Sequence, residues 1–251
     1  MKEVLELIEQ KRKEYAQLPL MKFLVDESID PLERLSWAPC FAPFAMTFKD
    51  INARVFREEP ADSLLQEMIN KHSYEDGRHW RWYLNDLEKL DFDESIKFTD
   101  ALRFLWGEET QKTRYFCYDL LGLCVFEKDP IIKLAVIESI EVTGSVTLSL
   151  FVNIGEQIQQ KTNHKLNYFS ASHYAVETGH IQAGSNYEET DEFLRSITLT
   201  QEQTVKACKA VEIVFKSFSE CMNEMMKYVE NHSSSVQRFK TVSTPQIQSI
   251  S

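Results

Sequence analysis

Glycine and proline are scarce in this sequence, with 7 of each among 251 residues. A loop-rich or all-β protein of this length needs more of both residues at its turns, so the low counts favour long helices. The chain is long enough to bury a substantial core, and no linker divides it. We therefore expect an all-α, single-domain bundle of about seven helices over residues 1–230, followed by a disordered tail over 231–251 that is rich in Ser, Thr and Gln.

Basic blocks and long apolar runs are also missing. The 28 Lys and Arg residues are outnumbered by 39 Asp and Glu residues, and the formal net charge of −11 makes nucleic acid and anionic membranes poor candidate partners. The first ten residues carry acids where a signal peptide needs an apolar run. No window reaches the roughly 18 uncharged apolar residues of a membrane span. These absences predict a soluble, cytoplasmic protein.

Cysteine occurs five times and never in a Cys-x-x-Cys pair. An odd count in a chain of this length does not indicate a disulfide framework. We expect reduced thiols in the core of a cytosolic protein. The residues concerned are Cys40, Cys117, Cys124, Cys208 and Cys221.

Histidine occurs only six times, and four of the six lie in two octets with the same spacing. Each octet places a histidine, an acid and a histidine at i, i+4 and i+7, which share one face of a helix over two turns. Two imidazoles and a carboxylate on one face are a half-set of ligands for a divalent transition metal. The candidate ligands are His72, Asp76 and His79 with Glu75 as a second acid in the first octet, and His173, Glu177 and His180 in the second.

A third helix offers one more carboxylate. Residues 131–160 are apolar around Glu138 and Glu141, which lie one turn apart. An unpaired buried carboxylate is costly, so an acid between Ile140 and Val142 is a plausible ligand, whereas a solvent-facing role is favoured for Glu138. Glu141 would complete a two-metal pocket built from inward-facing side chains of a helix bundle. The alternative for the octets is a solvated helix face or a buried network of hydrogen bonds without metal.

Helical periodicity also predicts the course of the chain. The mostly apolar residues 38–52 predict a buried helix whose aromatic side chains either pack in the core or wall an apolar substrate cavity. The candidate substrate-binding residues are Phe44, Phe48, Tyr83 and Phe169. Further helices are predicted over residues 2–24 with a break or kink at Pro19, over 60–90, 94–126, 131–160 and 164–184, within 185–200, and from 200 onward.

Four stretches together resemble a known family. They are Ala-Pro-x-x-Ala-Pro-Phe-Ala-Met-Thr-Phe-x-Asp-Ile-Asn at 38–52, the octet 72–79 followed by Trp82 and Asp86-Leu87, Glu141 within Ile-Glu-Val-Thr-Gly, and the octet 173–180. Over about residues 30–185 the chain is similar to the heme-oxygenase-like diiron oxidases and oxygenases. The resemblance implies the all-α fold of heme oxygenase.

The resemblance also implies a distribution of ligands over three core helices. The third core helix would supply the second octet, the second would supply Glu141, and the first would supply His79. This chain has His72 where the family commonly has a Glu. Either His72 replaces that carboxylate, or Glu75 or Asp76 takes its place, so the ligand set of one metal stays open.

The activity implied by the resemblance is oxidation of a small organic substrate by dioxygen at two ferrous ions. Mixed His and carboxylate ligands suit iron, with manganese as the alternative metal. Fatty acids, amino acids and aromatic amines are the substrate types, and an external electron donor and a homodimer are further candidate partners. Heme oxygenase activity itself is disfavoured, because its proximal His comes from an early helix and the first His here is His72. The rivals are a metal-independent binding protein of the same fold, and an interaction module that recruits a partner through its acidic surface and tail.

Overall fold

The computed structural model describes residues 1–93, 95–180 and 187–232, except for the side chains of 178–180 and 187–191. All regular structure in these ranges is helical, which confirms the predicted all-α class. The elements are α1 (Lys2–Tyr15), α2 (Pro19–Val25), α3 (Pro31–Arg34), η1 (Ala38–Phe41), α4 (Ala42–Ile51), η2 (Asn52–Phe56), α5 (Leu64–Asp76), α6 (Trp80–Lys89), α7 (Phe98–Leu105), η3 (Glu108–Thr110), α8 (Gln111–Cys124), α9 (Pro130–Thr162), α10 (Ala171–His180), α11 (Tyr187–Ser196) and α12 (Gln201–His232).

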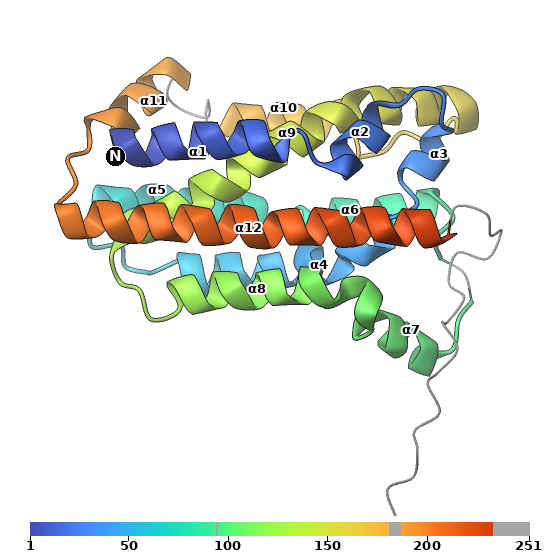
Figure 1. The fold of residues 1–251 in the computed structure, drawn as a ribbon, viewed down its shortest axis with the longest axis horizontal. Coiled ribbons are helices and arrows are strands. Elements are labelled where there is room, and N and C mark those ends of the chain that lie inside the picture. The colour runs from blue at the N-terminus through green and yellow to red at the C-terminus, as the bar shows by residue number, and fades with distance from the viewer. Residues whose placement is uncertain (94, 181–186, 233–251) are drawn as a thin grey trace, which may run out of the picture.

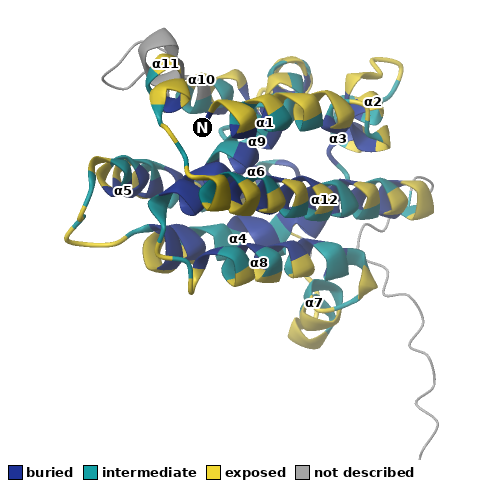
Figure 2. Cartoon of the chain, turned by 60° about the vertical axis from the view of Figure 1, so that its left-hand side comes forward, coloured by how far each residue is buried: buried dark blue, intermediate teal, exposed yellow. Residues whose placement is uncertain are grey.

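Two long helices, α9 and α12, form the centre of the bundle. They pack against each other, and α12 also contacts α1 and α8, while α9 contacts α1, α5 and α10. Figure 1 shows α12 running the length of the molecule between α1 on one side and α8 on the other. Buried residues line the inner faces of the helices in Figure 2, and exposed residues line the outer faces. Apolar burial between these layers therefore stabilises the fold.

Helix α9 follows the predicted range closely. The Asp129 carboxylate caps its start by accepting a hydrogen bond from the Ile131 N–H at 3.0 Å, and Pro130 occupies the first turn. The helix ends at Thr162, and its C-cap residue Asn163 has a left-handed φ of 61°. By length and composition α9 could cross a membrane, with a mean hydropathy of 1.5 in its most apolar window. Its apolar side chains instead lie in the core, which fits the core helix of a soluble protein.

The prediction of one continuous helix over residues 60–90 is wrong. Ser63 caps α5 by accepting a hydrogen bond from the Gln66 N–H at 3.2 Å, and the helix ends at Asp76 with Gly77 as its C-cap residue. Helix α6 starts at Trp80 with His79 as its N-cap residue. Gly is a poor helix former, and it lies where the axis breaks. The two histidines of the first octet therefore belong to different elements.

The second octet also sits differently from the prediction. Helix α10 begins at Ala171, whereas a start at His164 was expected. The intervening backbone stays non-helical because the N–H groups of residues 167–169 donate to the Asp86 carboxylate. Residues 94–126 likewise divide into α7, η3 and α8, with Glu94 outside the described residues.

Gly155 marks a close approach between α9 and the segment that precedes α10. A Cβ atom built there would collide with the Phe169 carbonyl oxygen, which is backbone and cannot swing away. We expect Gly155→Ala to lower the free energy of unfolding by about 1–3 kcal/mol, the usual cost of overpacking. Denaturant unfolding measures this change. Gly122→Ala in α8 is the matched control, because a Cβ there meets nothing within 4 Å; equal stability of the two variants would contradict the close approach.

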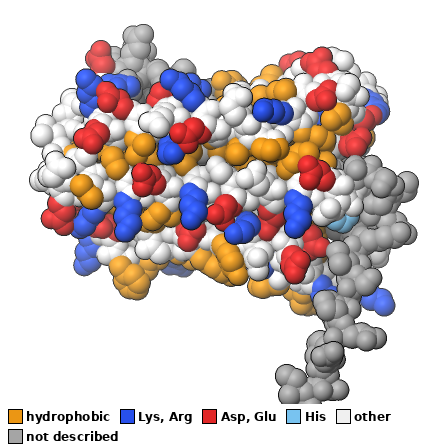
Figure 3. Space-filling model, viewed as in Figure 1, with side chains coloured by type: hydrophobic (Ala, Val, Ile, Leu, Met, Phe, Trp, Pro, Cys, Tyr) orange, Lys and Arg blue, Asp and Glu red, His pale blue; other side chains and the backbone are white. Residues whose placement is uncertain are grey.

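The cysteines and the surface charges are arranged as the composition predicted. All five cysteines are free thiols, and all except Cys208 are buried. Figure 3 shows acidic and basic side chains interspersed on the face that carries α1 and α12, without a basic stripe. The disordered tail was predicted from residue 231, but α12 continues to His232; the rest of the predicted tail, 233–251, lies outside the described residues.

Candidate metal centre

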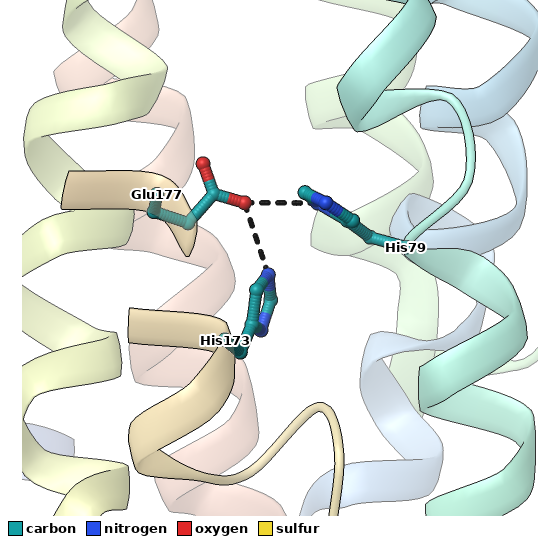
Figure 4. Close-up of side chains that lie close together, drawn as sticks. All are labelled: His79, His173 and Glu177. Carbon is teal, nitrogen blue, oxygen red and sulfur yellow. Dashed lines mark hydrogen bonds and ion pairs between the residues drawn. The ribbon is translucent and has the colours of Figure 1, made fainter. Parts of the chain in front are cut away.

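The first group of candidate ligands joins the two octets. Its members are His79 at the start of α6 and His173 and Glu177 on α10 (Figure 4). The same oxygen, Glu177 Oε1, lies 2.8 Å from His79 Nδ1 and 3.0 Å from His173 Nε2. One ligand atom from each residue lies within 4.8 Å of the others, which is close enough for a single ion.

The protonation of His173 is set by its second ring nitrogen. His173 Nδ1 lies 2.8 Å from the Tyr168 carbonyl oxygen, which can only accept a hydrogen bond, so Nδ1 carries the proton. In the neutral ring, Nε2 then presents a lone pair to the Glu177 carboxylate. A cation between the two atoms, or a second proton on the ring, removes this repulsion. A backbone carbonyl behind a ligand imidazole is the usual arrangement at metal sites.

His79 is held by an aromatic neighbour. Its ring stacks on Trp82 with centroids 4.7 Å apart and an interplanar angle of 18°. The Trp82 ring also meets His173 edge-on, with centroids 5.5 Å apart. One turn of α6 thus fixes the orientation of both imidazoles of the first group.

The second group of candidate ligands consists of His72 and Asp76 on α5 and Glu141 on α9. His72 Nε2 lies 3.0 Å from Asp76 Oδ2 and 3.3 Å from Glu141 Oε1. The nitrogen is buried, yet neither contact has the geometry of a hydrogen bond. A buried ring nitrogen aimed between two carboxylates without such a bond fits the donor set of a divalent cation.

The two groups adjoin each other. Asp76 Oδ1 lies 4.0 Å from His79 Nδ1, so the carboxylate faces the second group with one oxygen and the first group with the other. The sequence left open whether His72, Glu75 or Asp76 belongs to the site. The structure brings His72 and Asp76 to it, while Glu75 belongs to neither group of ligand atoms among the described residues.

Burial and neighbouring charges shift the pKa values of two residues in the second group, Glu141 and His72. Burial raises the pKa of Glu141 to about 8, and the negative charge of Asp76 adds to the shift. Burial alone would lower the pKa of His72, but the Asp76 and Glu141 carboxylates raise it well above its usual value. Without a cation the site therefore retains protons near neutral pH. A divalent ion would offset the negative charge of the buried carboxylates as these protons do, and with a larger positive charge.

These shifts predict a pH dependence for the metal-free protein. Both groups have a folded pKa above the unfolded value, so their stabilising protons are present at low pH and lost as pH rises through the folded pKa. We expect the free energy of unfolding to fall by roughly 2–4 kcal/mol between about pH 5 and pH 9. Denaturant unfolding at a series of pH values checks this. Bound metal should flatten the profile, and a metal-free profile that rises toward pH 9 would contradict it.

An apolar cavity of about 90 Å³ adjoins the two groups. Five of the six candidate ligands reach its wall, and the rest of the wall carries no charged side chain. The predicted residues Phe44 and Phe48 line it. Other residues of the wall are Trp37, Phe41, Ala45, Trp80, Ile140, Gly144, Ser145, Thr147, Leu148, Phe151, Tyr168, Phe218 and Met222.

Two predicted substrate-binding residues lie elsewhere. Tyr83 and Phe169 are fully buried in the core behind the cavity, and the Tyr83 hydroxyl donates to the Ala38 carbonyl at 2.8 Å. Glu138 also lies outside both ligand groups. The predicted ligand His180 ends α10, but its side chain lies outside the described residues.

From the sequence, Asp86 figures only within the family resemblance and has no predicted role in this region. Its carboxylate is fully buried on α6 and accepts hydrogen bonds from the N–H groups of Asn167, Tyr168 and Phe169 at 2.7–3.0 Å. Burial raises the pKa of Asp86, and these three donors oppose the shift. Asp86 thus holds the segment whose Tyr168 carbonyl orients His173. An acid one turn after Trp82 was the available signal.

Comparisons with known proteins address the fold. No protein-family model matches the sequence. No curated protein matches it either. A crystal structure of a domain of unknown function with a heme oxygenase-like fold, from Shewanella denitrificans, is similar to the chain with a TM-score of 0.62 and 13% identity. The similarity covers 94% of this chain and 95% of that one. At this identity it shows the fold alone. The chain therefore has the heme oxygenase-like fold that its sequence predicted.

Proposed function

We propose that this protein is a non-heme diiron oxidase or oxygenase that uses dioxygen to oxidise a small organic substrate. One observation carries the proposal: two adjoining groups of histidine and carboxylate ligands lie at the wall of an apolar cavity. Each group contains at least one imidazole and one carboxylate and no thiolate, a donor set that suits iron or manganese.

The chain's own residues fit two ions. His79, His173 and Glu177 would hold one, and His72, Asp76 and Glu141 would hold the other. When bound, the two ferrous ions supply the electrons and the open coordination positions that dioxygen chemistry requires. The donor set fits because the His173 lone pair faces the Glu177 carboxylate and the buried His72 nitrogen faces the Asp76 and Glu141 carboxylates, where a cation would supply the positive charge that protons otherwise supply.

The surrounding residues prepare the site. The Tyr168 carbonyl keeps the proton of His173 on Nδ1, so that Nε2 stays available as a ligand. Trp82 holds the rings of His79 and His173 in place. Phe41, Phe44 and the other apolar residues of the wall exclude water from the reacting groups. The wall offers no fixed charge beyond the ligands, which favours a substrate whose buried part is apolar or aromatic.

Iron content and oxygen consumption test the proposal. Protein produced with iron, or loaded anaerobically with ferrous ion, should hold about two iron atoms per chain. On exposure to oxygen, one member of a panel of fatty acids, amino acids and aromatic amines should increase oxygen uptake and yield an oxidised product detectable by mass spectrometry. Absence of any stoichiometric metal would overturn the proposal in favour of a metal-independent binding protein.

A further inference from the structure

Gly144 is the residue of α9 that faces the cavity one turn after the candidate ligand Glu141. The cavity face of the helix continues on either side of it with Ile140 and Leu148. Gly144 thus lies beside the second ligand group, at the point where a substrate would approach it.

Packing does not account for a glycine at this position. A Cβ atom built on Gly144 meets no heavy atom within 4 Å, in contrast to Gly155 on the same helix, where a Cβ would collide with backbone. The backbone does not require glycine either, because the residue lies inside a regular helix. Glycine is a poorer helix former than alanine, so its presence in mid-helix has a cost without a local benefit to the fold.

The space left at Gly144 is part of the cavity. The cavity measures about 90 Å³. The side chains of Phe218 and Met222 line it on the side of α12. In a space this small, two or three added carbon atoms decide which groups fit. We propose that Gly144 is a specificity-determining residue. The missing side chain makes room beside the candidate metal centre for an apolar substrate group, and a larger residue at position 144 would reduce the maximum size of the group that fits.

The proposal rests on the proposed function only in naming the ligand as a substrate. The test uses two apolar probes, xenon and indole, with iron-loaded protein kept without oxygen. Binding of xenon by NMR and of indole by titration calorimetry is compared in the wild type, Gly144→Ala, Gly144→Leu and the controls Gly122→Ala and Gly122→Leu. Gly122 lies on α8, also has nothing within 4 Å of an added Cβ, and does not line the cavity.

The wild type and both controls should bind xenon and indole alike. Gly144→Leu should weaken indole binding at least tenfold, with a smaller loss in Gly144→Ala. Both Ala variants should keep or raise the melting temperature, and all variants should keep the wild-type iron content. If Gly144→Leu does not fold, the weaker indole binding of Gly144→Ala carries the same test.

Three results would overturn the proposal: wild-type protein that binds neither probe, Gly144 variants that bind indole as the wild type does, or a melting temperature of Gly144→Ala below that of the wild type. Failure of the proposed function gives a different result, namely wild-type protein without stoichiometric iron. In that case the indole comparison still decides whether Gly144 controls access to the cavity.

Discussion

Replacing His173 with alanine is expected to weaken iron binding to the first ligand group by a hundredfold or more. The variant keeps only His79 and Glu177 of that group, and loss of a residue that merely supports a ligand already costs roughly 10–100-fold in metal affinity. His72→Ala should act in the same way on the second group. Metal analysis after dialysis should therefore find about one iron atom per chain or fewer in either variant.

The matched control is His164→Ala. His164 is an exposed histidine whose Nδ1 lies 3.1 Å from the Lys89 carbonyl, and it belongs to neither ligand group. This variant should keep the wild-type iron content. Equal iron content in His173→Ala, His72→Ala and His164→Ala would show that the two groups are not the iron ligands.

Asp86→Ala is expected to affect stability and metal binding together. The variant leaves the N–H groups of Asn167, Tyr168 and Phe169 without the carboxylate, and unsatisfied buried donors cost about 1–3 kcal/mol each. We expect a loss of roughly 3 kcal/mol or more in the free energy of unfolding. The Tyr168 carbonyl would then no longer be fixed behind His173, so iron affinity should fall by roughly 10–100-fold.

Asn85→Ala separates these two effects of Asp86. Asn85 accepts one hydrogen bond, at 2.8 Å, from the Asn167 side chain and reaches none of the three backbone N–H groups. It should cost little stability and leave iron affinity unchanged. If Asp86→Ala is less stable but binds iron as the wild type does, Asp86 supports the fold without positioning His173.

The histidine pattern predicted candidate ligands on three helices, but not how they divide. The octet spacing named Glu75, which lies in neither ligand group, and His180, whose side chain is outside the described residues, along with His72, Asp76 and His79. It also placed them on one helical face, whereas the break at Gly77 puts His79 with the second octet and leaves the other two with Glu141. Spacing describes a continuous helix, so a change of axis between two ligands cannot be seen in it.

The cavity wall was less predictable than the ligands. Phe44 and Phe48 line it, whereas Tyr83 and Phe169 pack behind it. All four are aromatic residues in apolar segments, and the same hydrophobic pattern serves a packed core and the wall of a void. Asp86 figured in the resemblance but had no predicted role, for a related reason: its partners are backbone N–H groups about 80 residues away, and a sequence pattern does not show backbone partners.

The ligand residues span positions 72 to 177 and belong to four helices, so bound ions would act as cross-links within the chain. Because the separated ligands meet only in the folded chain, bound ions would stabilise that state by mass action, and they would not restrict the unfolded chain as a disulfide does. The second group needs α5 packed against α9, and the first group needs α10, an element late in the order of the chain, beside the start of α6. Metal uptake would thus follow tertiary assembly, and a half-folded chain would remain both metal-free and open to proteases along that whole span.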